Sequence, residues 1–429
     1  MCYGWGDPHY VTFDGTYYAF QGNCSYWLVK EILPKYNFSV MIDNVYCDSL
    51  DGLSCPQSIT VFYKSFKIFI TQKDIKGIFT NQISVNDKPV SPAYQNDDFR
   101  TVTTGIDTVL IIPKIHAKVT FSGLIFSISL PYSEFGGNTQ GQCGTCDNNR
   151  TDDCMLPSGK IDPSCPHMAH KWHSNNSHCD PPVQPLPTPT PSTCNTTICE
   201  IIKSSVFEAC HKILDYRPFV EGCEFDVCHM HIHHIGCSSL KSYAQACADV
   251  GLCIDWRSAT KGLCEYKCPS PKVYKACGPL MEPTCDSWYN QKFIDMVDEF
   301  SAMTDVKLEG CYCSSGSILL SSNSNECVPD CGVKNIRPCN VSTTAVRLES
   351  KGCQSKHLVN VTSCSGACGT SSFYSAKMRS LQHMCSCCQE LATSERQVQL
   401  FCRDNTEVTY TYIHIDTCGC LQTDCSVLQ

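Results

Sequence analysis

Cysteine is the residue that most constrains how this chain can fold. The sequence holds 36 cysteines in 429 residues, about one residue in twelve. Cytosolic thiols are kept reduced, whereas disulfides form and persist in secreted and extracellular proteins. Cysteine at this density is typical of small domains whose thin cores need cross-links. The sequence therefore predicts a secreted, extracellular protein that is multidomain and disulfide-rich.

The charge balance and the hydropathy pattern exclude two classes of partner. The formal net charge is −9, and binding to a phosphate backbone needs clustered Lys and Arg. We therefore expect no nucleic-acid partner. No run of about 20 apolar residues occurs, so we expect no membrane insertion. The opening stretch Met1–His9 lacks the basic start and apolar segment of a signal peptide, so we expect the chain to be the tail of a longer precursor.

Seven Asn-x-Ser/Thr sequons agree with a secreted location. A single sequon is a weak sign, but several in one acidic, cysteine-rich chain support each other. The candidate N-glycosylation sites are Asn23, Asn37, Asn149, Asn175, Asn195, Asn340 and Asn360.

Hydrophobic periodicity divides the chain into segments of different structure. From Tyr10 to about Tyr132, short β-branched or aromatic runs such as Thr108–Ile112 predict an all-β sandwich or barrel. A Pro-rich and Thr-rich linker at 181–193 is expected to be extended. Apolar residues at helical spacing follow in Ile198–Leu214 and Leu240–Cys253.

The last two segments differ again. Residues 268–331 have many turn residues and little periodicity, which favours a small loop-rich module. From Cys339 onward, eleven cysteines accompany strand-like runs such as Glu407–Ile415. The chain is therefore expected to end in a disulfide-linked β domain.

Three motifs give the sequence a family resemblance. They are GWGDPHYVTFDG at Gly4–Gly15, GQCGTC at Gly141–Cys146, and the series CSGAC, CSCC and CGC near the C-terminus. With the order of the segments, they resemble the C-terminal region of gel-forming mucins over nearly the whole chain. One departure is that the cysteine-rich type C modules usual before the last domain are missing.

The resemblance implies a fold class and a set of domains. The fold class is an all-β type D domain, a small α-helical cysteine module, a loop-rich inhibitor-like module and a β-hairpin cystine knot. The implied bounds are 1–180 for the von Willebrand factor type D domain, 194–267 for the eight-cysteine module, 268–331 for the trypsin-inhibitor-like module and 339–429 for the cystine knot.

The C-terminal cysteines carry the main functional prediction. A cystine knot needs Cys-x-Gly-x-Cys and Cys-x-Cys, and the chain supplies Cys364–Cys368 and Cys418–Cys420; the alternative is an accidental spacing in a cysteine-rich tail. The resemblance implies the pairs Cys364–Cys418, Cys368–Cys420, Cys339–Cys388 and Cys353–Cys402.

Three cysteines of this segment then remain, Cys385, Cys387 and Cys425. Adjacent cysteines rarely meet disulfide geometry, and an unpaired cysteine in a secreted protein suggests an intermolecular bond. The resemblance implies that these residues join two chains into a homodimer, with higher polymers formed through the missing N-terminal part. The odd number of cysteines left over makes Cys2 the expected orphan, unless the inhibitor-like module lacks a partner after Cys331.

An acidic loop is a candidate calcium site. Asn148, Asp152 and Asp153 lie in a short loop between Cys146 and Cys154, and clustered oxygen ligands suit Ca²⁺. The resemblance adds Asp14 as a distant carboxylate and implies a structural role for the ion. The alternative is an ordinary solvated acidic turn.

Three other motifs carry weaker hypotheses. The Asp7-Pro8-His9 stretch has an acid-labile Asp-Pro bond, and the resemblance implies self-cleavage there; the alternative is a turn that stays intact. The Cys143-Gly144-Thr145-Cys146 stretch is read as structural rather than redox-active because no thioredoxin-like pattern surrounds it. The His229–His234 cluster could bind zinc or copper, but a surface loop held by disulfides is the favoured interpretation.

The sequence as a whole favours a structural protein over an enzyme. No Ser-His-Asp order or paired-carboxylate motif supports catalysis. The expected function is the covalent dimerisation of a secreted mucin tail that builds a mucus polymer. The alternatives are a cystine-knot ligand or antagonist of growth factors, and a protease inhibitor formed by Cys268–Cys331.

Overall fold

The structure is a computed structural model that falls into two units, Met1–Asp330 and Cys331–Gln429. It describes residues 1–48, 53–75, 78–90, 93–174, 179, 194–230, 235–285, 290, 307–321, 324, 326–331, 339–350, 352–365, 371–375, 380–402 and 406–423. None of the helices within these ranges is long and apolar enough to cross a membrane.

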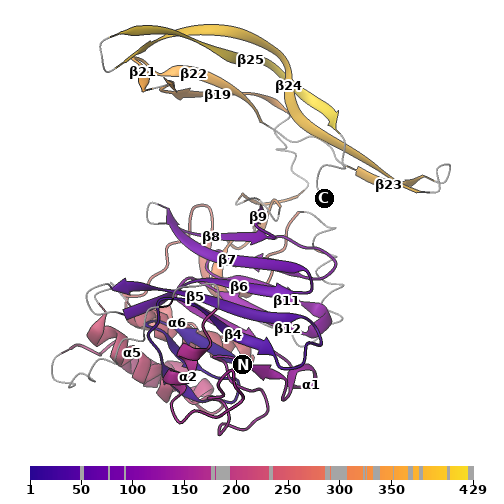
Figure 1. Ribbon diagram of the computed structural model, residues 1–429. Coiled ribbons are helices and arrows are strands. Elements are labelled where there is room, and N and C mark those ends of the chain that lie inside the picture. Colours follow the sequence, from indigo (N-terminus) through magenta and orange to yellow (C-terminus); the bar gives the residue numbers. More distant parts are fainter. Residues whose placement is uncertain are drawn as a thin grey trace. The chain divides into compact units, whose positions relative to one another are not determined.

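Two antiparallel sheets form the first part of the first unit (Figure 1). The first sheet has the order β10 (Arg100–Thr103), β11 (Thr108–Ile112), β12 (Ala117–Phe121), β13 (Ile125–Ser129), β1 (Cys2–Trp5), β2 (His9–Val11) and β3 (Tyr17–Ala19). The second has the order β14 (Thr139–Gln140), β4 (Ser25–Glu31), β5 (Phe38–Asp48), β6 (Leu53–Tyr63), β7 (Phe66–Ile75), β8 (Ile78–Val85) and β9 (Lys88–Val90).

The first sheet is buried on both of its faces. One face packs into the main core with Val40, Val61 and other residues of the second sheet, and the other contacts helices from residues 199–264. Accordingly every residue of β1, β11 and β12 is buried, without the alternation of a half-exposed strand. A strand covered on both sides reads as a nearly continuous apolar run.

The strand predictions are confirmed in the middle of this domain. The expected strand Thr108–Ile112 is β11 with the same bounds. Asn86 and Asp87 connect β8 to β9 with φ of 49° and 63°. Two successive positive φ values belong to a type I′ hairpin turn, for which Asn and Asp are suitable residues.

The helices of the first unit are short, and most of them follow the sheets in the sequence. They are α1 (Tyr132–Phe135), α2 (Cys165–Lys171), α3 (Glu200–Lys203), α4 (Glu208–His211), α5 (Arg217–His229) and α6 (Gly236–Asp249), with 3₁₀ turns η1 (Pro113–Ile115), η2 (Ser205–Phe207) and η3 (Arg257–Thr260). The segment Ile198–Leu214, with its helical spacing, is helical in short pieces: the chain becomes extended at Ser204 (φ −75°, ψ 168°), which divides the segment into α3, η2 and α4.

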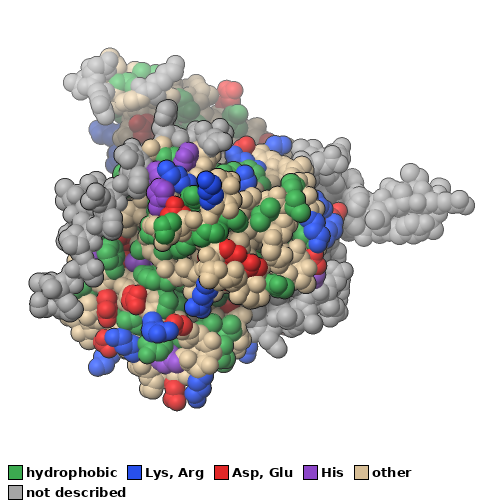
Figure 2. Space-filling model, turned by 60° about the horizontal axis from the view of Figure 1, so that its bottom comes forward, with side chains coloured by type: hydrophobic (Ala, Val, Ile, Leu, Met, Phe, Trp, Pro, Cys, Tyr) green, Lys and Arg blue, Asp and Glu red, His purple; other side chains and the backbone are tan. Residues whose placement is uncertain are grey.

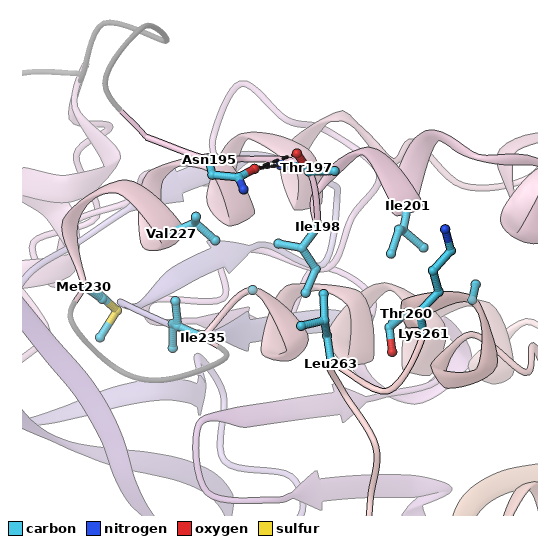
Figure 3. Close-up of a pocket in the computed structure, with 12 residues that line it drawn as sticks. Asn195, Thr197, Ile198, Ile201, Val227, Met230, Ile235, Thr260, Lys261 and Leu263 are labelled. Carbon is cyan, nitrogen blue, oxygen red and sulfur yellow. Dashed lines mark hydrogen bonds between the residues drawn. The ribbon is translucent and has the colours of Figure 1, made fainter.

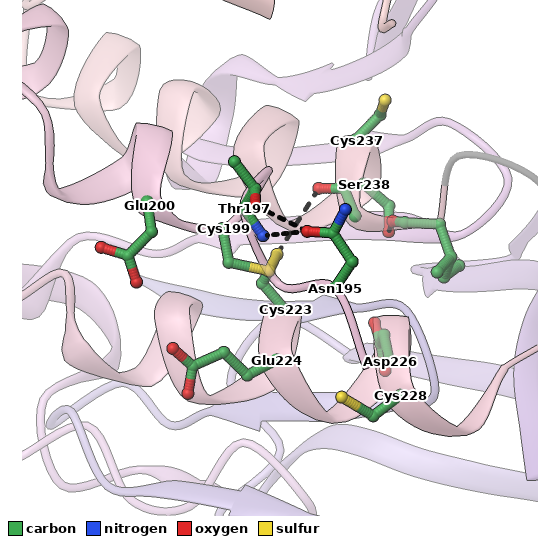
Figure 4. The surroundings of a disulfide bond; sticks show 12 residues. Asn195, Thr197, Cys199, Glu200, Cys223, Glu224, Asp226, Cys228, Cys237 and Ser238 are labelled. Carbon is green, nitrogen blue, oxygen red and sulfur yellow. Dashed lines mark hydrogen bonds between the residues drawn. A yellow bond between two sulfur atoms is a disulfide. The ribbon is translucent and has the colours of Figure 1, made fainter. Parts of the chain in front are cut away.

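Disulfides hold these helices together. Cys199 at the start of α3 is bonded to Cys223 of α5 (Figure 4), and Cys210 of α4 is bonded to Cys247 of α6. Further bonds are Cys194–Cys228 and Cys237–Cys264. The expectation of short helices cross-linked by disulfides is met.

Residues 268–330 contain two small two-stranded sheets. They are β15 (Val273–Pro279) with β16 (Lys307–Tyr312), and β17 (Ile318–Leu319) with β18 (Cys327–Val328). Disulfides Cys268–Cys311 and Cys313–Cys327 lie within the segment, whereas Cys253–Cys277 connects it to the helical module. The boundary expected at 267/268 is therefore bridged covalently.

Buried ion pairs also connect the parts of the first unit. Lys118 of β12 contacts Asp249 of α6 at 2.6 Å, and Lys241 of α6 contacts Asp107 at 2.6 Å. Arg257 makes a bidentate contact with Glu309 of β16, with both N–O distances at 2.8 Å. These contacts link the sheets, the helices and the β15–β16 hairpin through charges that are largely withdrawn from water.

The second unit is a set of extended hairpins (Figure 1). Its strands are β19 (Asn340–Val346), β20 (Glu349–Ser350), β21 (Cys353–Ser355), β22 (Val359–Ser365), β23 (Ser371–Ser375), β24 (Ser380–Phe401) and β25 (Glu407–Thr423). Only Cys353, Ser355 and Leu400 are buried among its described side chains, while Leu391, Val408 and Ile413 are exposed. The fold class is confirmed: the protein is disulfide-rich and mostly β, with few helices.

We predict that breaking the buried Lys241–Asp107 pair on one side strongly destabilises the first unit. Removing one partner of a buried pair leaves an uncompensated charge, which costs about 3–5 kcal/mol. Lys241→Met is therefore expected to lower the free energy of unfolding by that amount, as measured by denaturant titration. Lys241→Met combined with Asp107→Asn should recover most of the loss.

The control is Lys35→Met, since Lys35 contacts Glu134 on the surface with its side chain 55% exposed. An exposed pair is worth about 0–1 kcal/mol. If Lys241→Met and Lys35→Met lowered the free energy of unfolding equally, the buried pair would matter no more for stability than the exposed one.

Candidate functional sites

The cystine-knot cysteines are joined across the hairpins of the second unit. Cys364 of β22 is bonded to Cys418 of β25, and Cys339 is bonded to Cys388 of β24. Cys353 of β21 is bonded to Cys402. These are pairs that the resemblance implies. The fourth implied pair, Cys368–Cys420, lies outside the described residues and side chains.

The three expected linker cysteines are placed only in part. Positions 385 and 387 lie in β24, where they pair with positions 423 and 421 of β25. Their side chains are outside the description, as is Cys425 altogether.

The prediction that Cys2 is an orphan is wrong. Cys2 of β1 is bonded to Cys143, and Cys331 is also in a disulfide. The free cysteine of the described part of the chain is Cys146, which is 7% exposed. Cys143 and Cys146 therefore do not pair with each other: the first is structural, and the second is a buried thiol whose pKa burial raises.

The acidic loop is folded around hydrogen bonds to its carboxylates. Asp14 Oδ2 accepts hydrogen bonds from the backbone N–H of Asp147 (3.1 Å) and of Asn149 (3.3 Å). Asp152 accepts one from the Thr145 hydroxyl at 2.9 Å. Asn148 has a φ of 67°, in the left-handed region that Asn tolerates. The loop thus brings Asp14 and Asp152 together from distant parts of the sequence.

Asp153 is the buried member of this loop. Its Oδ2 accepts hydrogen bonds from the hydroxyls of Thr12 (2.7 Å) and Thr16 (2.5 Å), while its buried Oδ1 has no hydrogen-bond partner. Burial, with smaller effects of Asp14 and Asp152, raises the pKa of Asp153 to about 6. A nearby cation would relieve this crowding of negative charge.

The donor set of the loop is therefore of the kind that Ca²⁺ prefers, because it consists of carboxylate and amide oxygens. Within the described ranges, however, no three His, Cys, Asp or Glu side chains come close enough to form a metal-binding group. The calcium site stays a prediction.

The Asp7-Pro8-His9 stretch is completely buried under helix α5. His9 Nε2 lies 2.7 Å from Asp226 Oδ1, and both side chains are inaccessible to solvent. The Tyr17 hydroxyl lies 3.0 Å from His9 Nδ1, and Asp7 Oδ1 accepts a hydrogen bond from the backbone N–H of Ser54 at 3.1 Å. The motif is therefore not an exposed turn.

Two glycines permit this close approach. A Cβ on Gly6, whose φ is +61°, would lie 2.0 Å from Asp226 Oδ2. A Cβ on Gly222 of α5 would lie 3.0 Å from both Trp5 Nε1 and His9 Cγ. The helix can therefore bring Asp226 onto the motif only because both positions lack a side chain.

The charges in this cluster favour a protonated Asp7. Burial, together with the neighbouring Asp226, raises the pKa of Asp7 from 3.8 to about 7. Burial alone would lower the pKa of His9, but the charge and hydrogen bond of Asp226 outweigh it, so the net direction is upward. The group expected to titrate at mildly acidic pH is thus Asp7 rather than His9.

No pattern in the sequence indicated Asp226 as a functional residue. It lies at the i+7 position of the buried stripe Phe219, Gly222, Cys223 and Asp226 on α5, where an apolar residue is the normal choice. Helix α5 itself was not among the segments for which apolar spacing predicted a helix. Pro218 in its first turn is nevertheless a recognised signal for the start of a helix.

The histidine cluster and the sequons are placed as follows. His229 ends α5, with Nδ1 at 2.9 Å from the Phe225 carbonyl oxygen, and 231–234 are outside the described residues. Asn175 is also outside them. Asn23 is half-buried, and the other sequon asparagines, Asn37, Asn149, Asn195, Asn340 and Asn360, are exposed.

On the face of the molecule seen in Figure 2, Lys and Arg side chains are interspersed with Asp and Glu. This mixture agrees with the acidic net charge and gives that face no continuous basic surface for a phosphate backbone.

Comparisons with known proteins define the class of this chain. Residues 2–160 match the family model of the von Willebrand factor type D domain, residues 198–265 match the C8 domain, and residues 336–428 match the cystine-knot domain. The protein is thus of the multidomain class that combines a type D domain, a C8 domain and a cystine knot.

Similarity to whole proteins narrows this class. The chain is 40% identical to human mucin-5AC over 360 residues and 40% identical to mouse mucin-2 over 345 residues. It is also 40% identical over 343 residues to the intestinal mucin-like protein of Rattus norvegicus. Each match covers 77% of this chain, but only 6%, 7% and 40% of these relatives, respectively.

These findings identify the chain as a relative of the C-terminal region of gel-forming mucins. The matched relatives are mucins, which are structural, non-enzymatic proteins, in agreement with the expectation of a structural protein.

We predict that the pH dependence of stability contains a contribution from Asp7. Its pKa of about 7 in the folded state exceeds the ordinary 3.8. The folded chain then holds a proton that the unfolded chain has lost, so stability falls as the pH rises from about 4 to 7. Asp7→Asn should remove this loss and be more stable than the parent at pH 8, by on the order of 2 kcal/mol.

The measurement is chemical unfolding of both proteins between pH 4.5 and 8. The advantage of Asp7→Asn should shrink steadily toward the acidic end. A difference that does not change with pH would show that Asp7 has an ordinary pKa.

Proposed function

We propose that this chain is the covalent assembly end of a secreted, extracellular gel-forming mucin. Two copies would be joined by interchain disulfides through Cys385, Cys387 and Cys425, and upstream segments would extend the dimer into a mucus polymer. Similarity to mucins and the cystine-knot match support this role.

The observation that carries the proposal is the thin core of the second unit. Ile413, Leu391 and Val408 are 68%, 55% and 48% exposed on the long β24–β25 hairpin. Exposed apolar side chains on a unit that buries so few others support a surface that meets a partner. Positions 385 and 387 lie on this hairpin, opposite positions 423 and 421 of β25.

The test is electrophoresis of the oxidised full-length chain with and without reductant. We expect a dimer that reductant converts to monomer. The triple variant Cys385→Ser, Cys387→Ser, Cys425→Ser should be monomeric without reductant. Cys146→Ser is the matched control and should remain dimeric, because that thiol is buried in the first unit.

A monomeric parent chain, or a dimer that survives the triple substitution, would contradict this assignment. If Cys146→Ser were monomeric instead, the interchain disulfide would lie in the type D domain.

We propose also that the acidic loop binds a structural Ca²⁺ through Asp14, Asn148, Asp152 and Asp153. The unpartnered Oδ1 of Asp153 and the raised pKa of that carboxyl support a missing positive charge. A bound ion would hold the loop between Cys146 and Cys154 against β2 and β3.

Calcium is then expected to stabilise the protein, by about 2.7 kcal/mol at a hundred times its dissociation constant. Thermal unfolding with and without calcium measures this effect. Asp152→Asn should abolish it, whereas Asp162→Asn, which changes an aspartate paired with surface His167, should retain it. An unchanged transition in the parent chain argues against the site.

A second candidate function is self-cleavage of the Asp7–Pro8 bond. In this step an Asp7 carboxyl oxygen bonds to the Asp7 carbonyl carbon, the C–N bond to Pro8 breaks, and the proline nitrogen takes up a proton. The products are a cyclic anhydride and a chain beginning with Pro8. The raised pKa of Asp7 favours this step, because a protonated Asp7 carries the proton that the nitrogen needs.

We expect cleavage to accelerate as the pH falls from 8 to 5.5 and to cease in Pro8→Ala. The disulfide Cys2–Cys143 would keep residues 1–7 attached, so mass spectrometry must follow reduction. An intact chain after several days at pH 5.5, once reduced, would exclude self-cleavage.

A further inference from the structure

The C8 domain carries an apolar groove that the proposed functions do not use. The groove has a volume of about 540 Å³, within the range of small-molecule sites. Its lining residues include Ile198, Ile201, Val227, Ile235 and Leu263 (Figure 3). Leu263 is 53% exposed, so the groove presents aliphatic side chains to solvent.

Asn195 lies at the rim of this groove and is also the acceptor of a glycosylation sequon, Asn195-Thr196-Thr197. Its Oδ1 accepts hydrogen bonds from the backbone N–H of Thr197 (3.1 Å) and from the Thr197 hydroxyl (2.5 Å). These two bonds turn the oxygen away from the groove and fix the side chain.

The amide nitrogen of Asn195 is consequently left on the side of the groove. Figure 3 shows it directed toward the space between Val227 and Ile198. The nitrogen is the atom to which an N-linked sugar is attached, so the first sugar would begin at the opening of the groove. The Cys199–Cys223 disulfide beside Asn195 holds this geometry (Figure 4).

A second sequon shows that the turn alone does not create this arrangement. Asn149 Oδ1 accepts the same two hydrogen bonds from Thr151, but its Nδ2 donates to Asp152 Oδ2 at 3.3 Å. Asn149 thus has the same turn, but its nitrogen faces a carboxylate. Asn195 combines the turn with an apolar groove beside its nitrogen.

We propose that the groove is a binding site for this chain's own carbohydrate: the proximal N-acetylglucosamine of a glycan on Asn195 covers it. The apolar C–H face and the acetyl methyl of the sugar would pack on Ile198, Val227 and Leu263. Because the sugar is tethered at the rim, little freedom is lost when it settles there. The glycan then acts as part of the C8 core.

This inference requires passage through the secretory pathway, as the proposed function does. Occupancy of the other sequons separates the two ideas. If a glycan were found on Asn37 but none on Asn195, the protein would still be a secreted glycoprotein. Only the proposal about the groove would then be overturned.

The test compares glycoforms of the full-length chain secreted by cultured cells. One sample is trimmed to a single N-acetylglucosamine per site, and one is fully deglycosylated. The trimmed form should keep the thermal transition of the untreated protein, and full removal should lower it by on the order of 2–4 °C. Binding of a hydrophobic dye should rise severalfold only on full removal, because the groove is then exposed.

Variants locate the effect. Thr197→Ala, which removes the Asn195 sequon, should reproduce full removal, and Thr197→Ser, which keeps the sequon, should not. Ser39→Ala removes the Asn37 sequon and is the matched control; it should leave dye binding unchanged.

Leu263→Ala should lower the transition more in the trimmed protein than in the fully deglycosylated one. Ile213→Ala, at a 60% exposed position outside the groove, should act equally in both. The proposal would be overturned if Asn195 carried no glycan, or if removal of the glycan changed neither dye binding nor thermal stability. It would also be overturned if Leu263→Ala lowered the thermal transition equally in the trimmed and the fully deglycosylated protein.

Discussion

The contact between the first sheet and the C8 helices is the constraint on which the first unit depends. Trp5 of β1 stacks on Phe219 of α5 with ring centroids 4.6 Å apart, and Tyr3 meets the same ring edge-on. The sheet would otherwise present an apolar face to water, and the helices would leave part of their shared core uncovered. Each part has core residues of its own, but each also supplies surface that the other buries.

The buried charges follow from this contact. Once α5 and α6 cover the sheet, Lys241, Asp226 and Asp249 can no longer reach water, so each must meet an opposite charge from the sheet domain. His9, Asp107 and Lys118 provide it. Such pairs add little net stability compared with apolar packing, but they penalise any other alignment of the helices on the sheet.

Residue patterns predicted those features that depend on local sequence. The strand Thr108–Ile112 follows from periodicity, and the disulfide-linked helical module follows from helical spacing together with cysteine density. The interrupted helix after Ile198 does not, because disulfides to α5 and α6 fix its pieces in different directions. The prediction that Cys2 is unpaired failed for a related reason. The number of cysteines shows whether one must be left over, but only the fold determines which cysteines come close enough to bond. The role of Asp226 could not be predicted from local sequence, because its partner His9 is more than two hundred residues away.

The Cys2–Cys143 and Cys24–Cys179 bonds have a mechanical consequence. They span sequence separations of 141 and 155 residues and enclose nearly all of both sheets. A tensile load entering at Cys2 would pass through sulfur directly to Cys143, so residues 3–142 would bear almost none of it. The sheets could then remain folded in a stretched fibre, because covalent bonds rather than rows of hydrogen bonds would lie along the line of force.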